Sequence, residues 1–83
     1  MKVWAKLLID GKNIKDTVIE NKLPLTFANY EILLREIAYT LDIPTPLTMK
    51  IYYNHFKQFN THKFNEKDFV ESIDFEYLEL ENI

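Results

Sequence analysis

Histidine and serine, side chains that often take part in catalysis or metal binding, are scarce in this chain and poorly spaced for either task. Its two histidines, His55 and His62, lie seven residues apart, and there is no cysteine. A zinc site needs three or four ligands, and a histidine pair on one helix needs a spacing near four. Ser72 is the only serine, and no glycine flanks it as in a nucleophile elbow. We therefore expect no metal site and no serine or cysteine nucleophile.

The acidic side chains near the end of the sequence do not predict a catalytic pair either. Their spacing is that of the solvent-facing positions of a strand; they are Asp74, Glu76, Glu79 and Glu81. A single glycine also leaves no glycine-rich loop for the phosphates of a nucleotide. The sequence therefore predicts a protein that is not an enzyme and that uses no cofactor.

The elements that must position the remaining residues begin with a hairpin. Residues 2–9 alternate between apolar and more polar side chains, as a strand with one buried face does. Asp10 and Gly11 follow, and an Asp-Gly pair is typical of a tight turn that needs positive φ at both positions. Residues 12–20 then form the returning strand. Trp4 falls on the more polar face of the first strand, where it can pack under a neighbouring element or mark an interface.

A first helix is expected over 29–41. Its apolar residues recur at spacings of three and four and line one helical face. They are Tyr30, Leu33, Leu34, Ile37, Ala38 and Leu41, and Phe27 in the preceding turn continues the same spacing. Thr26 or Asn29 can cap its N-terminus. The helix should end near Asp42, because the residue before Pro44 avoids the helical region.

A second helix is expected over 46–59, with Thr45 as its N-cap and Pro46 at the first helical position. At about 100° per residue, its apolar residues fall within an arc of roughly 120°; they are Met49, Tyr52, Tyr53, Phe56 and Phe59. The opposite side of this helix carries Lys50, Asn54, Lys57 and Gln58. A strand over 47–53 is the alternative, because its residues favour strands. It would give a β-grasp-like ββαβ(α)β order.

Residues 60–65 read as a polar connection. Asn65 can cap a short turn through Asp68, which would point Phe69 and Val70 inward.

The last segment, 72–83, predicts a third strand that pairs with the hairpin. Its apolar alternation changes phase after Tyr77, which indicates a β-bulge, and its acids would protect an exposed sheet edge. We therefore expect one α+β domain over 1–83, with a hairpin, two helices and a C-terminal antiparallel strand in the order ββααβ.

Composition narrows the class of protein. The chain is 47% hydrophobic and 14% aromatic, which argues against disorder. The lack of cysteine, of a signal-peptide pattern and of a long apolar run predicts a soluble cytoplasmic protein without membrane contact. Residues 43–65 hold three lysines and no acid, whereas 66–83 hold seven acids and one lysine. We expect these two segments to lie against each other; the alternative is a basic face kept for an anionic partner.

Two phrases of the chain resemble a known group of sequences. LREIAYTLDIPTP (34–46) and FNEKDFVESIDFEYLELE (64–81) are similar to those of small uncharacterised proteins from AT-rich, low-G+C bacterial genomes. The resemblance covers nearly the whole chain. It implies a bacterial cytoplasm, and it carries no activity, ligand or site residue.

Two functional hypotheses follow from the sequence. The first is a small interaction or regulatory module that binds a protein partner or a second copy of itself, with Trp4 as part of a self-association surface. The second is a nucleic-acid-binding module. The two helices would then form a helix-turn-helix around 42–45, and the polar face of 46–59 would read bases and phosphates through Lys50, Asn54, Lys57 and Gln58.

Overall fold

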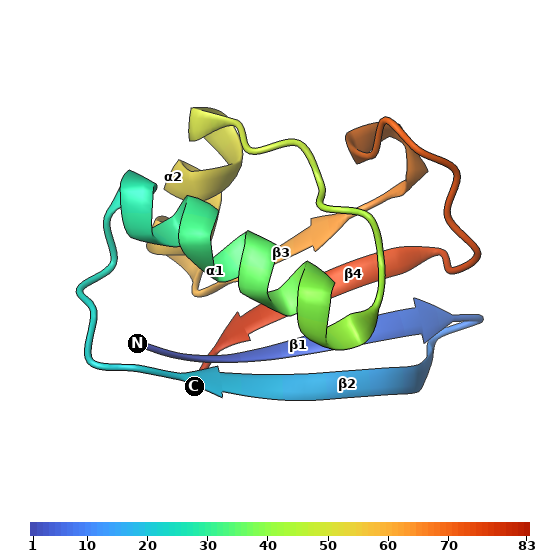
Figure 1. Cartoon of the computed structure of the whole chain (residues 1–83), viewed down its shortest axis with the longest axis horizontal. Coiled ribbons are helices and arrows are strands. Elements are labelled where there is room, and N and C mark those ends of the chain that lie inside the picture. Colours follow the sequence, from blue (N-terminus) through green and yellow to red (C-terminus); the bar gives the residue numbers. More distant parts are fainter.

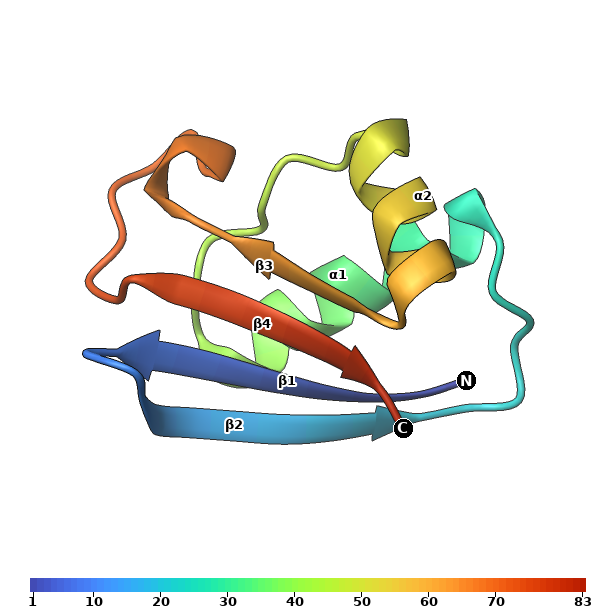
Figure 2. The same ribbon diagram turned by 180° about the vertical axis from the view of Figure 1, so that it is seen from behind.

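The computed structural model describes all residues, 1–83, as four antiparallel strands with two helices on one side of the sheet (Figures 1 and 2). The sheet order is β2-β1-β4-β3. In chain order the elements are β1 (Lys2–Ile9), β2 (Lys12–Glu20), α1 (Phe27–Leu41), α2 (Lys50–Phe59), β3 (Thr61–Phe64), the 3-10 turn η1 (Glu66–Asp68) and β4 (Tyr77–Asn82). The expected α+β class and the order of hairpin, two helices and C-terminal strand are confirmed, with one strand added.

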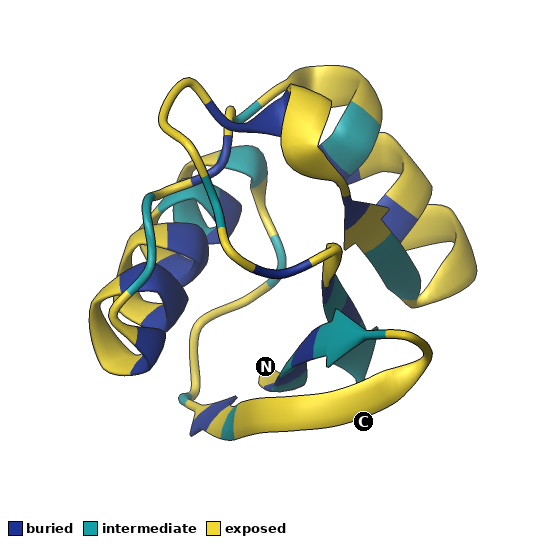
Figure 3. Ribbon diagram, turned by 90° about the vertical axis from the view of Figure 1, so that its right-hand side faces the viewer, coloured by how far each residue is buried: buried dark blue, intermediate teal, exposed yellow.

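The N-terminal hairpin forms as expected. Asp10 and Gly11 both have positive φ, 52° and 74°, which is the backbone of a primed turn and suits glycine at the second position. Near the turn the β1–β2 register shifts between Leu7 and Leu8, leaving Ile14 as the extra residue of a bulge. β2 is an edge strand, and Figure 3 shows it exposed along most of its length.

The core lies between the sheet and the helices. Alternate residues of β1, beginning with Val3, face it together with Leu78 and Leu80 of β4. The buried face of α1 matches the expected one; it consists of Tyr30, Leu33, Leu34, Ile37, Ala38 and Leu41. α2 and β3 contribute the fully buried rings of Phe56 and Phe64. Each strand and each helix therefore contributes residues from one of its faces to a single apolar cluster.

Both ends of α1 are capped by identifiable groups. The Thr26 hydroxyl accepts the backbone N–H of Asn29 at 3.2 Å, so Thr26 is the N-cap. The helix ends at Asp42, which adopts the left-handed conformation with φ 56°. The Lys15 ammonium donates to the Leu41 carbonyl at 2.9 Å, where the helix dipole favours positive charge. The predicted C-terminal end is confirmed, whereas the helix begins at Phe27, two residues before the expected start, because Thr26 rather than Asn29 is the N-cap.

The start of the second helix was predicted wrongly. α2 begins at Lys50 rather than at Pro46, and Met49 is its N-cap without a side-chain hydrogen bond. The reason is a tertiary contact: Pro46 is buried, and the Leu47 N–H donates to the Asp68 carbonyl at 2.7 Å. This bond fixes the segment before the helix against η1. The alternative of a strand over 47–53 is also wrong.

The third strand of the sheet is β3, in a segment that had been predicted as a connection. Asn60, with φ 59°, turns the chain directly from α2 into β3, which pairs with β4. β4 is therefore a central strand, so the expected edge position is wrong. The expected bulge is also wrong, because the strand begins only at Tyr77. Asn65 caps η1 as predicted, and Phe69 is buried, whereas Val70 is 86% exposed.

Tyr30 is the one core tyrosine whose hydroxyl has no partner. The hydroxyl is buried without a hydrogen bond, and burial raises the pKa of Tyr30. A buried, unpaired polar group costs free energy, so we expect Tyr30→Phe to raise the free energy of unfolding by about 1 kcal/mol. The matched control is Tyr53→Phe, since the Tyr53 hydroxyl donates to the Leu25 carbonyl at 3.2 Å. That control should lose about 1 kcal/mol in urea unfolding; equal losses in both variants would contradict this account.

Candidate functional site

The sheet face opposite the helices has nothing packed on it. In Figure 1 α1 lies in front of the strands, and from behind, in Figure 2, the strands lie in front of α1, while α2 stands beside β3 in both views. The buried residues of α2, Tyr53 and Phe56, belong to the same core as those of α1. Side chains that alternate with the core residues cover this uncovered face, which we call the open face. It consists of Lys2, Trp4, Lys6 and Leu8 from β1, Asp16, Val18 and Glu20 from β2, Thr61 and Lys63 from β3, and Tyr77, Glu79 and Glu81 from β4.

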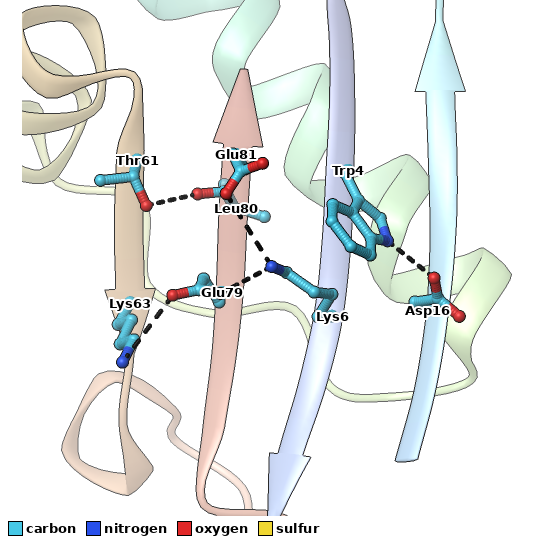
Figure 4. Close-up of polar contacts among 8 residues, drawn as sticks. All are labelled: Trp4, Lys6, Asp16, Thr61, Lys63, Glu79, Leu80 and Glu81. Carbon is cyan, nitrogen blue, oxygen red and sulfur yellow. Dashed lines mark hydrogen bonds and ion pairs between the residues drawn. The ribbon is translucent and has the colours of Figure 1, made fainter. Parts of the chain in front are cut away.

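A row of alternating charges crosses the middle of the open face (Figure 4). Each strand supplies one member, directly opposite its neighbours; in sheet order they are Asp16, Lys6, Glu79 and Lys63. The Lys6 ammonium lies 2.9 Å from one Glu79 carboxylate oxygen, and the Lys63 ammonium lies 3.7 Å from the other. The two central side chains are only 13% and 19% exposed. We call these four residues the charged row.

Apolar pairs flank the charged row on both sides. Trp4 lies opposite Val18 across β1 and β2, and Leu8 lies opposite Tyr77 across β1 and β4. The Trp4 indole N–H donates to Asp16 at 2.7 Å, and the Lys6 ammonium sits 4.0 Å from the centre of its ring. These contacts hold the indole in one orientation. The open face thus combines fixed apolar groups with charges that are already paired.

The sequence had placed Trp4, named as part of a self-association surface, on the more polar face of its strand and had placed Glu79 and Glu81 on the solvent side of another, and both placements hold. It did not place Tyr77 with them. Tyr77 was expected on the same side as Phe75, but Phe75 precedes β4 and is buried. The buried positions Leu78 and Leu80 could have placed Tyr77, Glu79 and Glu81 together on the opposite side, because side chains alternate along a strand.

The polar face of the second helix is present but is not part of a helix-turn-helix. Its four residues are all exposed on α2; they are Lys50, Asn54, Lys57 and Gln58. The connection between the helices runs over 42–49, twice the length expected, so the short turn of that motif is not formed. Of the three lysines in 43–65, Lys63 pairs with acidic Glu79 as expected.

His55 and His62 meet where α2 turns into β3. Their Nδ1 atoms lie 3.3 Å apart, and His55 Nδ1 lies 3.0 Å from the Thr61 carbonyl oxygen. Because that oxygen only accepts, neutral His55 carries its hydrogen on Nδ1. Neutral His62 then offers its Nδ1 lone pair and carries its hydrogen on Nε2, which is buried without a partner. No group of three or more His, Cys, Asp or Glu side chains is placed to hold a metal ion.

This histidine contact predicts that acid weakens the fold. Burial lowers the pKa of His62, as does the neighbouring His55, while the charge of Asp68 acts in the opposite direction. Tyr52 also faces the ring, stacked at 4.9 Å between ring centres, and the β4 residue opposite His62 is the uncharged Leu80. Since the lowered pKa belongs to the folded state, the unfolded chain takes up the proton first, and stability falls as pH drops through about 6.5.

We expect the melting temperature of the unmodified chain to fall more between pH of about 7.5 and 5.5 than that of His62→Gln, which lacks the titrating ring. Carboxylates titrate in both proteins, so the difference between the two curves reports on His62. Parallel curves would show that His62 does not contribute.

Neither helix has the length and apolar character needed to span a bilayer. Comparison with known proteins adds no relative: no family model, no curated protein and no solved structure matches this chain.

Proposed function

We propose that this chain is a small protein-interaction module, regulatory rather than catalytic, which binds its partner through the open face. The observation that carries the proposal is an entire sheet face left without a covering layer. Sheets ordinarily pack at least one face in a core, and a second face with half-exposed aromatic and aliphatic groups is suited to an interface. Val18 is 48% exposed and Tyr77 is 38% exposed.

The charges on the open face suit a protein partner. Lysine and acidic side chains alternate and nearly balance, so the face lacks the basic excess that nucleic acid binding requires. The central Lys6–Glu79 pair is already shielded from water, and a partner covering it would have little further solvation to remove. A bacterial cytoplasm is the setting that we propose for this module.

Capture by the tagged chain tests this function. The open-face variant Trp4→Ser/Tyr77→Ser removes both aromatic groups, while Tyr39→Ser removes a tyrosine that is 89% exposed on α1. We expect specific partners to be retained by the unmodified chain and by Tyr39→Ser, and to be lost with the open-face variant. Partners retained equally by all three proteins would show that the binding surface lies elsewhere.

A second candidate function is nucleic acid binding by α2. The observation in its favour is that Lys50, Asn54, Lys57 and Gln58 are exposed on a helix without a single acidic residue. Fluorescence polarisation with duplex and single-stranded DNA at about 50 mM salt separates the two functions. Binding that disappears in Lys50→Ala/Lys57→Ala would favour this second function, and absence of binding would eliminate it.

A further inference from the structure

We infer that the open face binds a second copy of this chain, with the two sheets packed face to face around a two-fold axis parallel to the strands. The inference rests on the proposed function, since it names the partner of that same face. It is carried by the order of signs in the charged row: negative on β2, positive on β1, negative on β4 and positive on β3.

A two-fold axis along the strands reverses the order of the strands in the facing sheet. β2 then lies over β3 of the other copy, and β1 lies over β4. Asp16 therefore faces Lys63 of the partner subunit, and Lys6 faces Glu79 of the partner subunit. The row read backwards has the opposite sign at every position, so all four positions meet an opposite charge.

One of the two apolar pairs agrees with the same axis, whereas the axis places Trp4 over Glu81 of the partner subunit. Leu8 and Tyr77 are opposite each other on β1 and β4, so the axis places Leu8 over Tyr77 of the partner subunit, twice in the dimer. Packed sheets lie about 10 Å apart and rotate by about 30°, a spacing that long side chains such as lysine and tyrosine can bridge.

Other symmetric arrangements fit less well. An axis parallel to the sheet but perpendicular to the strands would place each strand over its own copy, and where it passes through the charged row it brings Asp16 onto Asp16 and Lys6 onto Lys6. Pairing through the free edge of β2 meets the bulge at Ile14 and the charges of Lys15 and Asp16, which are devices that prevent edge pairing. Only the axis along the strands makes the charged row complementary to itself.

The size of the face sets the expected strength. Four strands at about 4.8 Å and six residues at about 3.4 Å give a projected area of about 400 Å² per copy. Such an interface belongs to the small, transient class, and we expect a weak dimer that forms at micromolar to millimolar concentration.

Charge reversal at the two ends of the row tests the inference. Asp16→Lys alone and Lys63→Glu alone each place like charges together twice, and each should weaken dimerisation by at least roughly tenfold in sedimentation velocity. An equimolar mixture of the two variants should dimerise again, because both contacts then join opposite charges. Asp16 and Lys63 lie on opposite edges of one sheet, about 14 Å apart, so this rescue cannot arise within one chain.

Lys57→Glu, an exposed reversal on α2, is the control and should dimerise like the unmodified chain. The inference is overturned if the unmodified chain is monomeric at millimolar concentration, or if the mixture stays monomeric while both single variants are folded by circular dichroism. A monomeric chain that still captures a different protein through Trp4 and Tyr77 would overturn this inference and leave the proposed function standing.

Discussion

Phe56→Ala is expected to lower the free energy of unfolding by about 3–5 kcal/mol, because it removes a buried aromatic ring and leaves a cavity. Phe56 is fully buried in α2 and packs against Tyr30, with 5.6 Å between ring centres. A domain of this length has a total stability of about 4–12 kcal/mol, so the variant should lose at least about a quarter of it. Urea unfolding followed by circular dichroism measures the change.

The matched control lies in the same helix. Phe59→Ala removes the same ring from a side chain that is 56% exposed, and we expect a loss below about 1 kcal/mol. Similar losses for the two variants would mean that α2 does not pack on the sheet through the Phe56 side. The pair is informative because helical spacing alone assigns both rings to one apolar face.

That difference shows how far periodicity can be trusted in this chain. The hairpin and α1 were predicted well because their patterns are long and each has a local end signal: the Asp10-Gly11 turn and the Thr26 cap. α2 has only ten residues, and its burial is confined to Tyr53 and Phe56. Phe59 ends the helix beyond the core and packs against His55 instead, with ring centres 4.7 Å apart.

The features that the sequence could not predict depend on long-range pairing. The start of α2 is set by the hydrogen bond from Leu47 to the Asp68 carbonyl, and no local signal reports that contact. β3 has four residues, too few for an alternation to be recognised, and it is a strand because it pairs with β4. Trp4 could be identified as a surface residue, but the charged row exists only once β4 lies between β1 and β3.

Asp68 is the second residue whose loss should have a large effect, because it joins three separate parts of the chain. It is buried, and one carboxylate oxygen accepts the Tyr52 hydroxyl of α2 at 2.5 Å. The other oxygen accepts the backbone N–H of Asn65 at 2.9 Å and completes the capping box of η1. Its backbone carbonyl holds Leu47 in the connection before α2.

Asp68→Ala should lower the free energy of unfolding by about 3 kcal/mol, since it leaves the Tyr52 hydroxyl and the Asn65 N–H without their charged acceptor. Glu66→Ala removes an exposed acid from the same turn and should change stability by less than about 0.5 kcal/mol.

A double-mutant cycle of Asp68→Ala with Tyr52→Phe isolates the hydrogen bond between these two side chains. Because the hydrogen bond to Asp68 is the main cause that raises the pKa of Tyr52, the variant should also shift that pKa down in an ultraviolet titration. A stability loss without this shift would mean that Asp68 acts through the η1 cap alone, and that α2 is held in place by its buried rings rather than by this carboxylate.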